Sequence, residues 1–276
     1  WLAARGRVFE GYADLWRWSV DDLEGFWKSI WDYFEIIADG EIRRVVSDDP
    51  MPRARWFDGA KLNYAEHVLR HETNGDADRA MLHHASELRP LQQASWREVA
   101  GSVRKLATKL RAMGIGKGDR VVAYMPNIPE AVIAMLATTA IGAVWTSAAP
   151  EFGAQTVIDR FAQIAPKLVF AVNGYRYGGK DFDRIDDLQA ILTALPTAQT
   201  LVMLDYHPAA RKAPAFNGET LAWQDMLAGA DVAREDFSFE RVENDHPLWI
   251  LFTSGTTGLP KPIVHNHHGI VVEHYK

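Results

Sequence analysis

The sequence predicts an α/β fold in which mostly parallel sheets are covered by helices, preceded by a helical N-terminal extension. Two observations indicate this class. From Trp96 onward, short apolar runs alternate with stretches that carry apolar residues at helical spacing. The stretch between one apolar run and the next is long enough for a crossover helix, which parallel strands require. The chain has 276 residues, of which 47% are hydrophobic and 24% charged, typical of a globular protein.

Residues 1–90 form the predicted extension, and residues 91–276 the main domain. Ser19 and Asp22 have the spacing of a helix capping box. An apolar stripe at helical spacing follows, made of Leu23, Phe26, Trp27, Ile30, Trp31 and Phe34. A partner-binding or membrane-surface helix is one interpretation. Because the polar face carries acidic rather than basic residues, we favour a helix that packs on the main body. Residues 48–52, with two prolines, should interrupt regular structure.

The main domain is predicted element by element. Gly114 is a natural stop for the first helix, and Pro129 suits the first turn of the second. The expected helices are 99–113, 129–141, 155–164, 185–195 and 223–228. The expected strands are 121–125, 144–148, 168–172, 201–204 and 248–252. Residues 206–220, with several prolines and an Asn-Gly pair, should form an exposed loop.

Composition excludes several classes of function. The net charge of −6 gives no basic field for nucleic acid or for an anionic membrane. The absence of cysteine excludes disulfides, thiolate nucleophiles and cysteine zinc sites, and fits a cytoplasmic protein. No apolar run approaches the roughly 18 residues that a membrane span needs. Because the first residue is Trp1 rather than Met, we expect the sequence to begin inside a longer gene product.

A loop suited to phosphate follows the last predicted strand. The loop runs from residue 253 to residue 261 and reads Thr253, Ser254, Gly255, Thr256, Thr257, Gly258, Leu259, Pro260 and Lys261. Glycines let backbone N–H groups turn toward an anion, and four hydroxyls add short donors. Lys261 adds a cation suited to phosphate. A plain turn between strands is the structural alternative, but a short Gly/Thr turn does not require the terminal Pro-Lys.

The loop differs from the common Gly-x4-Gly-Lys-Ser/Thr motif of kinases and ATPases. Pro260 stands where that motif needs its second glycine, and Pro262 stands where it needs a hydroxyl for Mg²⁺. Two prolines around Lys261 also argue against a long helix opening there. We therefore expect residues 262–265 to be a short extended segment, and any Mg²⁺ to be held by carboxylates outside this chain.

The nine-residue loop resembles the signature loop of the adenylate-forming superfamily, which includes acyl-CoA synthetases and luciferases. The resemblance implies that a carboxylate attacks the α-phosphate of ATP and that a CoA thiol then displaces AMP. It also implies the N-terminal large domain of such an enzyme, incomplete here. By the same resemblance Lys261 is catalytic. The implied contacts to the ATP phosphates are Thr253, Ser254, Gly255, Thr256, Thr257, Gly258 and Lys261. ATP, Mg²⁺ and CoA are the implied cofactors.

Other stretches narrow the resemblance to the short-chain acyl-CoA synthetases. Residues 54–66, with Arg-Trp-Phe-Asp-Gly, look like their N-terminal extension. Further matches, in order, are residues 124–131, 150–153, 159–167 and 174–180. The sequences of these stretches resemble those of family members that activate acetoacetate more closely than those of members that activate acetate. Acetoacetate is therefore the expected acid, with acetate or propionate as the alternative.

Two cations follow the strand predicted at 168–172. Arg176 and Lys180 flank Gly178 and Gly179, and a solvated turn is one interpretation of this pattern. The other is a contact to a CoA phosphate, by similarity to a Gly-x-Arg-x-Gly-Arg stretch of acetyl-CoA synthetases.

Several histidines lie near the chain end but do not have the spacing of a metal site. We interpret His265 as packing near the substrate pocket, and residues 266–269 as the start of a helix. No metal ligand is predicted in this chain.

Three functions compete. The first is an acid–CoA ligase, the second an ordinary P-loop kinase or ATPase, and the third a nucleotide-binding fragment inactive on its own. The later motifs of the resembled family, among them a ribose-binding Asp and a mobile C-terminal domain, should lie beyond Lys276. We therefore expect the missing C-terminal part of the same enzyme to be the main partner, alongside small-molecule substrates.

Overall fold

The computed structural model describes residues 1–73, 75–253 and 258–276. The strands are β1 (Arg44–Val46), β2 (Trp56–Asp58), β3 (Ala80–Ser86), β4 (Arg89–Ser95), β5 (Arg120–Tyr124), β6 (Val144–Ala148), β7 (Leu168–Val172), β8 (Gly174–Tyr177), β9 (Lys180–Asp183), β10 (Thr200–Leu204), β11 (Glu219–Ala222), β12 (Pro247–Thr253) and β13 (Lys261–Asn266). The α-helices are α1 (Tyr12–Asp21), α2 (Leu23–Tyr33), α3 (Tyr64–Leu69), α4 (Trp96–Ala112), α5 (Pro129–Ala140), α6 (Ala154–Phe161), α7 (Ile185–Thr193), α8 (Trp223–Met226) and α9 (His267–Tyr275). Three 3₁₀ turns are η1 (Ala3–Arg5), η2 (Arg70–Glu72) and η3 (Ala162–Ile164).

A seven-stranded sheet forms the centre of the molecule, in the order β11-β10-β7-β5-β6-β12-β13. All neighbouring strands run parallel except β12 and β13, which are antiparallel. Three separate two-stranded ribbons, β1–β2, β3–β4 and β8–β9, complete the strands of the described residues. The α/β fold class with a mostly parallel sheet is confirmed.

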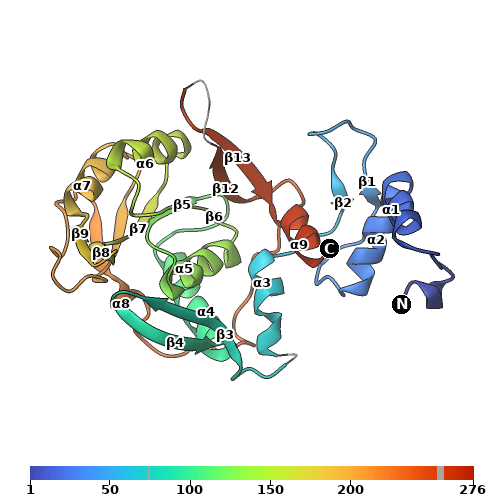
Figure 1. Cartoon of the computed structure of the whole chain (residues 1–276), viewed down its shortest axis with the longest axis horizontal. Coiled ribbons are helices and arrows are strands. Elements are labelled where there is room, and N and C mark those ends of the chain that lie inside the picture. The colour runs from blue at the N-terminus through green and yellow to red at the C-terminus, as the bar shows by residue number, and fades with distance from the viewer. Residues whose placement is uncertain (74, 254–257) are drawn as a thin grey trace.

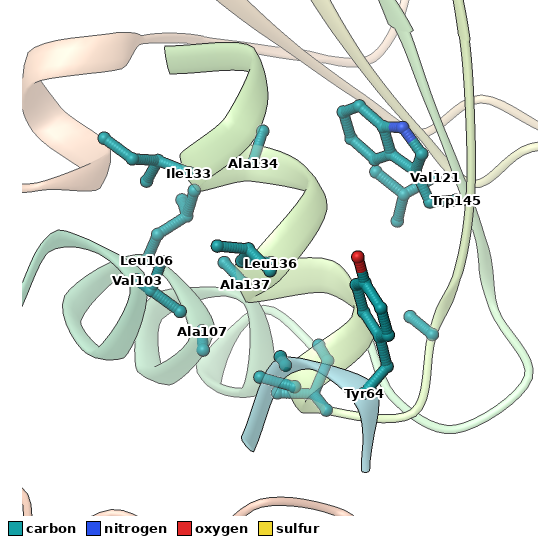
Figure 2. Close-up of a cluster of buried hydrophobic side chains, with 14 of the residues drawn as sticks. Tyr64, Val103, Leu106, Ala107, Val121, Ile133, Ala134, Leu136, Ala137 and Trp145 are labelled. Atoms are coloured by element: carbon teal, nitrogen blue, oxygen red, sulfur yellow. The ribbon is translucent and has the colours of Figure 1, made fainter. Parts of the chain in front are cut away.

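Successive side chains along each strand point to opposite faces of the sheet, and a layer of helices covers each face. Val122 and Tyr124 of β5 pack with α6 and α7 in one core, whereas Val121 and Ala123 pack with α4 and α5 in the other. Figure 2 shows this second core, with α5 between α4 and the sheet and with Trp145 of β6 beside Val121. Both faces of the central strands are buried, which explains why they read as continuous apolar runs.

The first part of the N-terminal extension, with α1, α2 and the β1–β2 ribbon, lies beside α9, at the opposite end of the molecule from β8 and β9 (Figure 1). Trp31 of α2 stacks on Phe57 with ring centroids 4.3 Å apart, and its ring lies 6.4 Å from that of His268 in α9. Trp27, Ile30 and Phe34 pack against the same core. The interpretation of the aromatic stripe as a packing face is confirmed.

Two local predictions in the outer parts of the chain were wrong. Ser19 does not cap a helix: it lies inside α1, and its hydroxyl donates to the carbonyl of Trp16. Asp22 caps α2 instead, because its carboxylate accepts the N–H of Gly25. The predicted loop at 206–220 is also too long, since β11 begins at Glu219 and pairs with β10. No helix of the described residues is long and apolar enough to cross a membrane.

Candidate functional site: a loop at the end of β12

Strand β12 carries the candidate site at its carboxyl end. Leu248 and Ile250 are buried in the sheet, and the hydroxyl of Thr146 on β6 donates to the carbonyl of Ile250 at 2.6 Å. Among the described residues, Trp249 pairs in parallel register with Trp145 of β6. In open α/β sheets, ligands bind outside the carboxyl ends of the parallel strands, and the loop begins at that edge.

The two ends of the predicted phosphate loop face each other. Strand β13 returns antiparallel to β12, and its ladder pairs Thr253 with Lys261 and Phe252 with Pro262. Residues 262–265 are extended, as predicted. Ser254, Gly255, Thr256 and Thr257, four of the predicted phosphate contacts, lie outside the described residues. The pairing of β12 with β13 therefore brings Thr253 and Lys261, the first and last predicted phosphate contacts, next to each other.

The described part of the loop is open to solvent. Gly258 has φ +144°, a conformation that residues with a Cβ rarely adopt, and no atom of the other described residues lies within 4 Å of where that Cβ would be. Thr253 and Lys261 are exposed. No carboxylate of the described residues forms an ion pair with Lys261, so its ammonium group is available to an external anion. The cation of Lys261, the exposed backbone of Gly258 and the paired ends of the loop are together suited to binding a polyphosphate.

Strand β12 does not lie at the edge of the sheet, because β13 pairs with it through six residue pairs. Exposed apolar side chains remain on this ribbon: Leu251 is 52% exposed, Ile263 42% and Val264 55%.

A neighbouring element holds the end of the loop. The side-chain amide of Gln163, in η3, donates to the carbonyl of Pro260 at 2.9 Å. This contact ties the residue before Lys261 to the layer of α6 and α7. Sequence reasoning missed Gln163, because its partner lies 97 residues away and a polar residue at a helix end is unremarkable.

The connection after β6 lies at the carboxyl edge of the same sheet. The buried hydroxyl of Tyr124, at the end of β5, lies 2.9 Å from the carbonyl of Pro150 and 2.8 Å from that of Phe152. Burial raises the pKa of Tyr124 above its usual range, so this phenol stays protonated and can donate. It fixes the backbone of the Pro-Glu-Phe-Gly stretch noted in the sequence.

Arg176 and Lys180, the predicted CoA contacts, lie in the β8–β9 hairpin. This hairpin follows β7, which β5 and β6 separate from β12 in the sheet. The structure therefore does not bring these cations to the phosphate loop. The guanidinium of Arg176 is paired with Asp181 at 2.5 and 3.1 Å. The hydrogen bond from Arg176, and to a smaller extent the one from His207, lowers the pKa of the Asp181 carboxyl to about 2.

The histidines near the chain end are structural. His267 and His268 begin α9, and the side chain of Asn266 caps it, so the predicted helix start is confirmed. His267 accepts the N–H of Tyr64 through Nδ1 at 3.1 Å, and His268 Nε2 lies 3.1 Å from the carbonyl of Ala60. Burial lowers the pKa of His267 to about 3 and the pKa of His268 to about 4. Among the residues that the structure describes, no group of three potential metal ligands occurs.

Two family models together match almost the whole chain. The model described as AMP-binding enzyme matches residues 69–276, and the model described as acetyl-coenzyme A synthetase N-terminus matches residues 12–68. The first match contains the candidate loop and all of the seven-stranded sheet.

Curated relatives and a solved structure agree with these models. The acetoacetyl-coenzyme A synthetase of Rhizobium meliloti (strain 1021) is 41% identical, with all of this chain and 41% of the relative covered. A malonamoyl-CoA synthetase of Penicillium aethiopicum is 33% identical, with 98% of this chain and 38% of the relative covered. The structure of acetoacetyl-CoA synthetase from Streptomyces lividans matches with a TM-score of 0.92 and 45% identity, over 100% of this chain and 42% of that one. The chain thus spans about two fifths of the length of its relatives.

Proposed function

The chain belongs to the family of AMP-binding enzymes, and from that premise we propose that it is part of a ligase that joins acetoacetate to CoA at the expense of ATP. The observation that carries the proposal is the pairing of Thr253 with Lys261, which places at the carboxyl edge of the sheet a cation that no carboxylate of the described residues pairs with. The division at about residue 90 between extension and AMP-binding domain belongs to the same proposal.

The proposed reaction has two steps. A carboxylate oxygen of the acid attacks the α-phosphorus of ATP, the bond to the β-phosphate oxygen breaks, and pyrophosphate leaves. The thiol of CoA, losing its proton, then attacks the acyl carbon, and the bond to the AMP oxygen breaks. Pyrophosphate and AMP are the products, together with the thioester. Mg²⁺, held by residues outside this chain, would neutralise phosphate charge when bound.

The residues of this chain would act mainly on the first step. Lys261 would hold the β- and γ-phosphates together with Thr253, Ser254, Gly255, Thr256, Thr257 and Gly258. Such pre-oriented donors stabilise a leaving pyrophosphate without reorganising during the reaction, and each is worth about 2–4 kcal/mol by analogy with oxyanion holes. Gln163 would position the loop through Pro260. Arg176 and Lys180 remain the proposed contacts to CoA.

We favour acetoacetate over other short acids as the substrate because of the names of the relatives that align with the whole of this chain. Acetoacetate, and the malonamate named by the Penicillium aethiopicum relative, both carry a carbonyl group two bonds from the carboxylate. We therefore infer that the acid belongs to the 3-carbonyl acids. An acetyl- or propionyl-CoA ligase is the alternative, supported by the match of the extension to the acetyl-coenzyme A synthetase N-terminus.

A panel of acids tests this assignment in a protein of the length of the relatives. Isotope exchange between pyrophosphate and ATP should depend on acetoacetate and, more weakly, on malonamate. Butyrate is the matched control, because it has the same chain length as acetoacetate and no 3-carbonyl. Equal exchange with butyrate or better exchange with acetate would favour the alternative acids. The 276-residue chain alone should form no thioester, because a phosphate loop without the rest of the site cannot position three substrates.

A further inference from the structure

The turn between β8 and β9 has the backbone of an anion-binding site. Gly178 and Gly179 have φ +60° and +72°, so two consecutive residues are left-handed and their N–H groups point the same way. No atom lies within 4 Å of the Cβ position of either residue. Turns in which successive N–H groups converge attract carboxylates and phosphates.

A carboxylate of the chain already occupies this turn. Glu87, between β3 and β4, accepts the N–H of Gly178 on one oxygen at 2.6 Å and the N–H of Gly179 on the other at 2.8 Å. Glu87 is 91 and 92 residues from these partners, so this is a tertiary contact between two hairpin tips. A carboxylate that accepts hydrogen bonds from two backbone N–H groups uses the same donors that two oxygens of a phosphate would use.

The base of the Glu87 tip is fixed. The hydroxyl of Tyr206 donates to that of Ser86 at 2.6 Å, and the guanidinium of Arg89 lies 4.6 Å from the centre of the Tyr206 ring. Arg89 also pairs with Glu130 at 2.8 Å. The residues on either side of Glu87 are therefore anchored, whereas Glu87 itself is exposed and can rotate away.

The cations beside the turn divide into one that is neutralised and one that is available. Arg176 is engaged by Asp181, which also lies 2.9 Å from Nε2 of the buried His207. Lys180 is exposed, and no ion pair joins it to a carboxylate in the part of the chain that the structure describes. Loss of Glu87 from the turn would leave two backbone donors without a partner, with the exposed cation of Lys180 on the next residue.

We propose that Glu87 is an internal anion that occupies a phosphate position in the β8–β9 turn and is displaced when a phosphate monoester binds there. The proposal rests on the proposed function, in which the 3′-phosphate of CoA is that monoester. Glu87 then weakens CoA binding by competition and keeps the turn ordered when CoA is absent. This role differs from that of Lys180, whose cation attracts the phosphate.

Binding to the 276-residue chain tests the displacement. Glu87→Gln keeps the length of the side chain but removes the charge that competes with phosphate, and the matched control is Glu219→Gln, an exposed carboxylate at the start of β11. Calorimetry would measure the Kd of CoA, of dephospho-CoA and of inorganic phosphate. The backbone amide signals of Gly178 and Gly179 would report where phosphate binds.

Glu87→Gln should lower the Kd of CoA by about three- to tenfold, because one full charge no longer competes for the turn. The Kd of dephospho-CoA should change little, and phosphate should shift both glycine signals further than in the unaltered chain. Glu219→Gln should change none of these values. Glu87→Asp, which keeps the charge but is one methylene shorter and does not span both donors, should lower the Kd of CoA less than Glu87→Gln does.

The outcomes separate this inference from the proposed function. Unchanged or weaker binding of CoA and phosphate by both Glu87 variants, with an unchanged melting temperature, would overturn the displacement. A gain for inorganic phosphate without a difference between CoA and dephospho-CoA would keep the displacement and remove CoA from this turn. Failure of acetoacetate-dependent pyrophosphate exchange would reject the proposed function without affecting the Glu87 measurements.

Discussion

Thr253 and Lys261 are paired across the antiparallel ladder of β12 and β13, so the two ends of the predicted phosphate loop meet at the carboxyl edge of the sheet. Because both strands also belong to the seven-stranded sheet, the positions of these two residues are set by the core rather than by the loop.

Lys261→Ala should slow formation of the acyl-adenylate about 100-fold in a protein of the length of the relatives, because it removes a cation from the leaving pyrophosphate. Thioester formation from pre-made acyl-adenylate should change little, since pyrophosphate has already left by then. Single-turnover kinetics of the two steps measure the difference. Lys109→Ala, on an exposed position of α4, is the matched control. An equal loss in both steps would remove Lys261 from the pyrophosphate half of the reaction.

Gln163→Leu should raise the KM for ATP several-fold and leave the KM for the acid unchanged. The substitution keeps the side chain's bulk but removes the only described side-chain donor to the carbonyl of Pro260. Gln155→Leu serves as control, because Gln155 pairs with Asp159 on the surface of α6. Equal KM values for ATP in the two variants would show that the contact does not position the loop.

Arg104→Ala should destabilise the chain by about 3–5 kcal/mol, because it leaves the carboxylate of Glu72 buried without its partner. The guanidinium of Arg104 binds Glu72 at 2.6 and 3.0 Å and donates to the carbonyl of Val232 at 2.7 Å, and the two side chains are 9% and 10% exposed. Denaturant titration gives the free energy of unfolding. Arg97→Ala, on the same helix as Arg104, breaks the exposed ion pair with Asp78 and should have a far smaller effect. Similar losses in both variants would contradict the role of burial.

Stability should fall as the pH drops from about 6.5 toward 4. Burial lowers the pKa of His67 and of His268 to about 4 and that of His267 to about 3, against 6.5 in an unfolded chain. In that window the unfolded chain binds protons that the folded chain does not, so each histidine costs roughly 1–2 kcal/mol at pH 5. His67→Gln should flatten the slope of unfolding free energy against pH by about one proton.

The exposed His83 provides the control for that measurement. His83→Gln should leave the slope as it is in the unaltered chain, since His83 lies on the surface of β3. A flat profile between pH 6.5 and 5 in the unaltered chain would mean that these imidazoles are not buried as described.

The sequence is most informative where one interaction dominates. The five residues of β7 are all buried, so their apolar run allowed only a central strand. Gly114, with φ +75°, ends α4 as expected, because only glycine adopts that conformation without strain. The helix start at His267 was likewise readable, because the cap by Asn266 is local.

Features that depend on distant partners could not be predicted. Residues 262–265 read as extended, yet nothing in them shows that β13 pairs with β12 rather than leaving it at an edge. Ser19 and Asp22 fit the capping-box pattern. However, α1 continues past Ser19, and Asp22 is the residue that caps α2. Glu87 gave no signal at all, because its partners lie 91 and 92 residues further along the chain.

The fate of the carboxylate oxygen tests the proposed chemistry most directly. Acetoacetate labelled with ¹⁸O in its carboxylate would be converted by a protein of the length of the relatives, with ATP and CoA, and the products examined by mass spectrometry. Attack at the α-phosphate followed by thiolysis leaves one labelled oxygen on AMP, and pyrophosphate stays unlabelled. Label in orthophosphate, with ADP as the nucleotide product, would contradict the account, because it would mean attack at the γ-phosphate.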